Sequence, residues 1–124
     1  MSQALDYLVF DVSDDADEVH TFDAMASVWP AQWPALASEW RAVLHWARRH
    51  FGPEGPLDEG ALWDVDVQAW VEASPVQPLG LDMAHADLAA GQHLPSDQRC
   101  TLTLSLSGGA EFAAALRQQF DLLD

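Results

Sequence analysis

The sequence predicts an α+β fold, a two-layer sandwich in which two helices pack on one face of an antiparallel sheet of about five strands, in the order ββαβββα. Several segments alternate apolar and polar residues, as strands with one wet face do. Two other segments repeat apolar residues every three or four positions, which is typical of amphipathic helices. Because the apolar face of such a sheet must be covered, the helices are expected there. The 124 residues fit one globular domain, 1–124.

The longest periodic segment, Pro30–Phe51, is predicted to be the main helix of the core. Prolines suit its first turn, and Gly52 followed by Pro53 suits its end. Trp46 lies off the apolar stripe and has no predicted packing role. The stripe consists of Trp33, Leu36, Ala37, Trp40, Val43, Leu44, Ala47 and Phe51.

A second, narrower apolar stripe predicts a helix over Ala110–Leu123, after Gly108 and Gly109 end the preceding strand. Because this helix also has one apolar side, it is expected to pack on the sheet beside the first. Its stripe consists of Phe112, Ala115, Leu116, Gln119, Phe120 and Leu123.

Alternating segments predict five strands, the first two forming a hairpin and the last three an antiparallel meander. Both faces of the first strand are partly apolar, so it is expected inside the sheet rather than at its edge. The second strand keeps a helical alternative, because Ala24–Ser27 is a good helix former. Ser74–Pro78 is predicted to be a turn. The strands are Leu5–Val12, Val19–Trp29, Ala61–Glu72, Leu79–Asp87 and Arg99–Ser107.

The chain is strongly acidic, with 20 Asp and Glu against 5 Arg and a formal net charge of −15. This charge argues against binding to nucleic acid or anionic membranes, and it favours a cationic partner. No apolar run is long enough to span a bilayer, and the N-terminus does not resemble a signal peptide, so we expect a cytoplasmic protein. The chain has no Lys, Asn or Ile, residues with A/T-rich codons, which suggests a bacterial source with a GC-rich genome.

No residue pattern predicts a catalytic, metal or cofactor site. The histidines lack the spacing of a helical zinc site, and one cysteine cannot anchor a thiolate site. The acids of residues 11–18 do not match a calcium-binding loop. Cys100 alternates in phase with Leu102 and Leu104, so it is predicted to be an inert thiol in the core.

Trp70 is the main candidate for a binding anchor, because it lies on the polar face of its predicted strand with Asp64, Asp66 and Glu72. An aromatic side chain rimmed by acids suits a cationic partner. Trp46 is a second candidate, although either tryptophan could simply cover the edge of the core. The sequence therefore favours a non-enzymatic protein-binding module of the adaptor or toxin-neutralising type.

Two alternatives remain open from the sequence. The first is a small enzyme that uses Asp64 and Asp66 with His20 or His85, since paired carboxylates perform acid–base chemistry when one pKa is raised. A solvated sheet face is the simpler explanation of the two acids. The second alternative is a homodimer formed through sheet edges or Trp46. A pocket holding a histidine beside a carboxylate would support the enzyme, and a flat acidic face would support binding.

Overall fold

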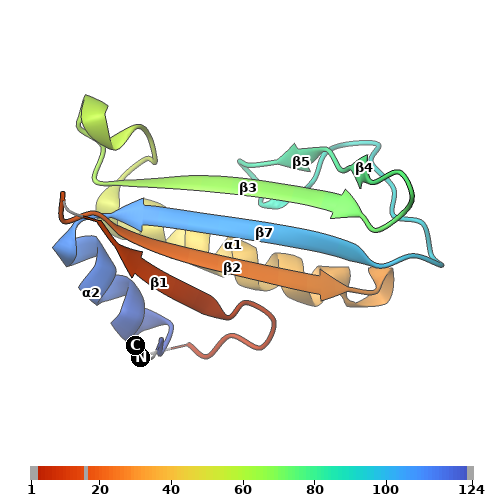
Figure 1. The fold of residues 1–124 in the computed structure, drawn as a ribbon, viewed down its shortest axis with the longest axis horizontal. Coiled ribbons are helices and arrows are strands. Elements are labelled where there is room, and N and C mark those ends of the chain that lie inside the picture. The colour runs from red at the N-terminus through yellow and green to blue at the C-terminus, as the bar shows by residue number, and fades with distance from the viewer. Residues whose placement is uncertain (1–2, 16, 123–124) are drawn as a thin grey trace.

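The computed structural model describes residues 3–15 and 17–122 and shows an α+β fold with a five-stranded antiparallel sheet, a small two-stranded sheet and two helices (Figure 1). The predicted fold class, sheet size and helix count are therefore confirmed, whereas the small sheet was not predicted. The strands are β1 (Phe10–Asp14), β2 (His20–Val28), β3 (Trp63–Val71), β4 (Gln77–Pro78), β5 (Leu81–Asp82), β6 (Asp87–Leu88) and β7 (Cys100–Gly108). The helices are α1 (Trp33–Phe51) and α2 (Ala110–Gln119), with 3-10 turns η1 (Pro30–Gln32) and η2 (Leu57–Glu59).

The strand order of the main sheet is β1-β2-β7-β3-β4, so β7 lies in the centre. It pairs antiparallel with β2 and with β3 along all nine of its residues. The predicted meander of the last three strands is therefore wrong, because β7 enters between β2 and β3. The predicted interior position of the first strand is also wrong. β1 is an edge strand, and Val9 just before it is 72% exposed because no second layer covers that side.

The segment between β3 and β7 also differs from the prediction. The expected turn contains β4, which supplies the fifth strand of the main sheet. The strand predicted over Leu79–Asp87 is instead broken into β5 and β6, which pair only with each other. A tight turn between β5 and β6 causes this break. In the turn, Asp82 Oδ1 accepts hydrogen bonds from the backbone N–H groups of Ala84 (3.0 Å) and His85 (3.2 Å).

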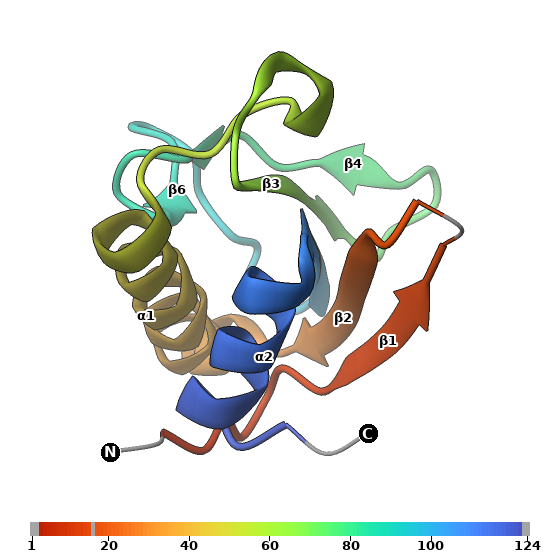
Figure 2. The same cartoon turned by 90° about the vertical axis from the view of Figure 1, so that its left-hand side faces the viewer.

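Both helices lie on the same side of the main sheet (Figure 2), and the core fills the space between them and its inner face. The predicted stripe of α1 is confirmed, since all its members are buried except the half-buried Phe51. On α2, Phe112, Leu116 and Phe120 are buried as predicted, and Leu123 lies outside the described residues. The inner-face side chains come from alternate positions of the three long strands: Phe22, Ala24, Ala26 and Val28; Val65, Val67, Ala69 and Val71; Cys100, Leu102, Leu104 and Leu106.

Polar contacts fix the position of α1. The Glu39 carboxylate accepts hydrogen bonds from three consecutive backbone N–H groups that precede β1. The donors are those of Asp6 (2.6 Å), Tyr7 (2.9 Å) and Leu8 (3.0 Å). At the other end of α1, Arg48 forms a two-pronged ion pair with Glu54, at 2.9 and 2.6 Å. These contacts join the helix to the chain on either side of it. Neither helix has the length and apolarity needed to cross a membrane, as judged on residues 3–15 and 17–122.

Gly108 allows α2 to lie close to the sheet. A Cβ atom at this position would be 2.4 Å from Cδ2 of Phe112, whose ring stacks on Trp63 at 5.7 Å between centroids. We therefore predict that Gly108→Ala lowers the free energy of unfolding by about 1–3 kcal/mol, since the ring must move out of its packed position. Urea denaturation measures this change. Gly109→Ala is the matched control, because a Cβ atom there meets nothing within 4 Å. Equal stability of the two variants would contradict this account of the packing.

Candidate functional site

The outer face of the main sheet is the candidate site, because the helices cover only the opposite face (Figure 2). The strand register places Asp11 opposite Asp23, Asp23 opposite Ser105, and Ser105 opposite Asp66. We call these four residues the acidic row. Its three carboxylate side chains belong to exposed residues, and Asp64 lies on the same face one pair further along β3. Alternation along each strand thus aligns acids from three strands into one surface.

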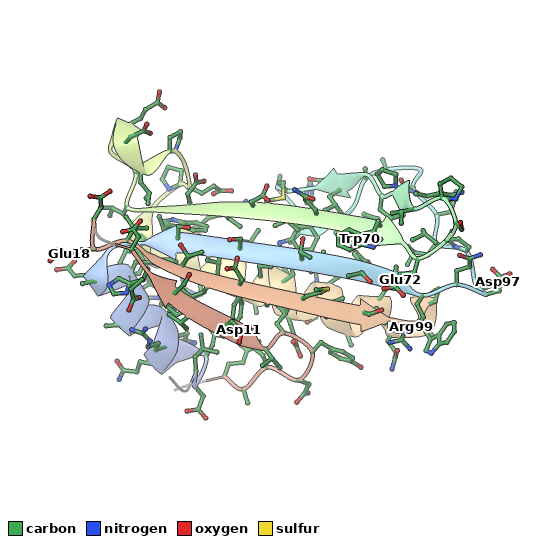
Figure 3. All side chains as sticks on the ribbon, viewed as in Figure 1. Asp11, Glu18, Trp70, Glu72, Asp97 and Arg99 are labelled. Carbon is green, nitrogen blue, oxygen red and sulfur yellow. The ribbon has the colours of Figure 1, made fainter. Side chains whose placement is uncertain are left out.

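The acidic row is electrostatically unfavourable for the isolated protein. Directly opposed like charges destabilise a sheet, and Asp11 and Asp23 are such a pair. Four of the five arginines lie on the helices, at positions 41, 48, 49 and 117. The fifth, Arg99, is at the opposite end of the outer face from Glu18, beside Glu72 rather than beside Asp11 (Figure 3). Arg99 therefore lies closer to Glu72 than to Asp11 of the row.

Glu72 organises the other end of the outer face. Its carboxylate accepts a hydrogen bond from the Thr101 hydroxyl and another from the Ser27 hydroxyl (3.1 Å). Arg99 completes this group, which we call the Glu72 network: it donates to Ser27 Oγ (3.2 Å) and to the Ser27 carbonyl (2.6 Å). The hydrogen bond from Thr101 is the main cause that lowers the pKa of Glu72, with Ser27 next. The carboxylate is thereby held in its ionised form.

Two tryptophans flank the Glu72 network. The Arg99 guanidinium lies 5.2 Å from the ring centroid of Trp29, a cation–π contact, and Trp29 is 47% exposed. Trp70 follows the outer-face phase predicted from the sequence and is half-buried opposite Thr101. Trp70 lines a surface hollow of about 500 Å³ beside β4. Part of Trp70 is thus accessible to a partner.

Trp46, the second tryptophan singled out from the sequence, lies away from the outer face. It is half-buried between the two helices, and its ring centroid is 5.6 Å from that of Phe120 and 6.3 Å from that of Phe112. On its own helix it also contacts Phe51, at 5.8 Å. Trp46 therefore holds α1 and α2 together. The apolar stripe of α1 alone did not reveal this role, because the contact depends on where α2 docks.

The structure does not bring together the residues of the enzyme alternative. His20 Nδ1 lies 2.5 Å from Asp14, and His85 Nδ1 lies 2.7 Å from Asp82. His20 also shares its sheet face with Gly108 and Trp63, the face opposite Asp64. The acids at positions 64 and 66 therefore have no histidine partner in the described part of the chain. Residues 3–15 and 17–122 also contain no cluster of three or more His, Cys, Asp or Glu that could hold a metal ion.

Cys100 lies in the core, as predicted. It is 1% exposed, and its thiol donates to the Val28 carbonyl across a distance of 3.6 Å. Burial is the main cause that raises the pKa of this thiol. A thiol held in its protonated form is a poor nucleophile.

Sequence reasoning missed four residues of the outer face: Asp11, Asp23, Ser27 and Arg99. Alternation alone placed Asp23 out of phase with its buried neighbours, so a signal was present in β2. The register that sets Asp23 against Ser105 was absent from the sequence, because it depends on β7 entering beside β2. The register that sets Asp23 against Asp11 depends on where the hairpin of β1 and β2 turns. Comparisons with protein-family models, curated proteins and solved structures find no match to this chain. Its function is therefore inferred from geometry.

The Glu72 network predicts an acid-sensitive contribution to stability. Because the pKa of Glu72 is lower in the folded state than in the unfolded state, its contribution is complete above the unfolded pKa of about 4.3 and is lost as the pH falls through the folded value. We expect Glu72→Gln to lower the urea midpoint at pH 7 and to lose less stability than the wild type between pH 5 and about pH 3. Glu59→Gln, an exposed acid of η2, is the control. Parallel pH profiles for wild type and Glu72→Gln would contradict the assignment.

Proposed function

We propose that this chain is a non-enzymatic binding protein, of the adaptor or toxin-neutralising type, whose outer sheet face binds a cationic protein. The observation that carries the proposal is the opposition of Asp11 and Asp23 on an uncovered face. Such a pair costs stability in the free protein. A lysine or arginine side chain from a partner offsets that repulsion. The same pair of acids that lowers the stability of the free protein therefore favours binding.

The residues predicted from the sequence on β3 and just after it extend this surface. Asp66 belongs to the acidic row, Asp64 adds charge beside it, and Trp70 adds an accessible aromatic ring. Glu72 is already engaged with Thr101 and Ser27, so it acts mainly by fixing that end of the face. A field of this sign accelerates encounter with a basic partner and repels acidic ones.

The proposal makes opposite predictions for stability and binding. We expect the double variant Asp11→Asn/Asp23→Asn to raise the free energy of unfolding by up to about 1 kcal/mol, because the opposed charges are gone. The same variant is expected to bind a basic probe, a short peptide in which lysine and valine alternate, several-fold more weakly at low salt. Urea denaturation and isothermal titration calorimetry measure the two effects.

The matched control removes two charges elsewhere. Asp58→Asn/Glu59→Gln lies in η2, at exposed positions away from the outer face, and changes the net charge equally. This control is expected to keep nearly the full affinity. If both double variants lose the same affinity, binding depends only on the net charge of the chain, and the outer face is not the site.

A further inference from the structure

One edge of the main sheet is open over the middle of β3, as judged on residues 3–15 and 17–122. β4 pairs with β3 only at two positions, Trp70 opposite Pro78 and Val71 opposite Gln77. β4 therefore covers the C-terminal end of β3 alone, as Figure 1 shows. A strand edge that lacks a neighbour presents backbone groups that can pair with another chain.

The direction of these backbone groups follows from two hydrogen bonds on the open side. Leu79 N–H donates to the Ala69 carbonyl (2.9 Å), and Gly55 N–H donates to the Trp63 carbonyl (3.2 Å). Both acceptors are at odd-numbered positions of β3. In an antiparallel ladder the backbone groups of alternate residues point to the same side. The odd-numbered residues of β3 therefore direct their N–H and C=O groups away from β7.

Val67 is the centre of this open edge. The N–H of Val65 is already occupied, because Asp64 Oδ1 accepts its hydrogen bond at 2.8 Å. The carbonyl of Val65 and both backbone groups of Val67 point outward, and in the part of the chain that the structure describes they have no hydrogen-bond partner. These three groups match what one added strand uses.

An apolar hollow of about 500 Å³ lies beside these groups. On the β3 side it is lined by Val67 and Ala69, and across from them by Leu79, Leu81 and Met83. Val67 and Ala69 belong to the inner-face phase of β3, whereas Asp64 and Asp66 belong to the outer-face phase. An added strand thus meets apolar side chains on one of its faces and carboxylates on the other.

We propose that an extended segment of the cationic partner binds here as an additional strand, pairing with Val67. This inference rests on the proposed function and adds the binding mode and the chemistry of the ligand. Since side chains of a strand alternate between faces, the segment carries lysine or arginine at every second position, facing Asp64 and Asp66. The intervening positions carry small or branched apolar residues, which enter the hollow.

The charge of the protein selects this occupant over a second copy of the chain. Pairing β3 with β3 would bring together two molecules that each carry a formal net charge of −15. Repulsion of that kind opposes self-association. A basic strand is attracted to the protein instead, because its positive charges approach the acidic outer face.

The test uses the full chain and two peptides of equal composition, one in which lysine and valine alternate and one in which they form separate blocks. We expect the alternating peptide to bind about tenfold more tightly, a difference worth roughly one or two backbone hydrogen bonds. We also expect it to slow hydrogen exchange of the Val67 amide, measured by NMR. Val67→Pro removes that N–H, which the protein itself does not use, and is expected to weaken binding about tenfold.

The outcomes separate this inference from the proposed function. Asp66→Asn is the companion variant, expected to weaken binding while the Val67 amide stays protected in the bound state. Binding of both peptides with equal affinity and without protection of Val67 overturns strand addition but leaves the acidic face as the site. Protection of Val67 without peptide, together with a mass that grows with concentration in sedimentation, overturns the inference in favour of a second copy. Absence of binding by either peptide overturns both proposals.

Discussion

The pairing of β7 with two neighbours is the interaction on which the rest of the structure depends. All nine of its residues are matched on one side by β2 and on the other by β3. Its inner side chains are fully buried, and its last residue, Gly108, has no side chain, which lets the Phe112 ring lie against the strand. The position of α2 follows from that contact, and Trp46 of α1 then packs on α2. The pairing of β7 thus determines the arrangement of the sheet, and its contact with α2 determines where the helices pack on it.

The same strand gives the outer face its chemistry. Through Ser105, β7 stands between Asp23 of β2 and Asp66 of β3, and through Thr101 it reaches Glu72. Hydroxyl side chains line the outer side of β7, and acids lie on β2 and β3 on either side of it. At one end Glu72 accepts hydrogen bonds from two hydroxyl groups, whereas Asp11 and Asp23 oppose each other. Glu72 thus contributes to the fold, whereas the opposed pair Asp11 and Asp23 costs stability.

The parts of the fold that depend on local pattern were predictable. Alternation identified β2, β3 and β7 almost to their observed ends, periodicity identified both helices, and phase alone placed Cys100 in the core and Trp70 on the outer face. Strand order was not predictable, because pairing between segments distant in sequence leaves no periodic signal. For the same reason the alignment of Asp23 with Ser105 and Asp66, and the packing of Trp46 on α2, became visible only in three dimensions.

The central place of β7 also has a consequence for how the protein is made. A ribosome delivers β1, β2, α1 and β3 before β7, so the strand that joins them arrives after its neighbours. Until β7 is synthesised, β2 and β3 lack the central strand with which both of them pair. Contacts between distant segments slow folding, and exposed apolar strands promote aggregation. The net charge of −15 opposes such association, because it makes nascent chains repel one another.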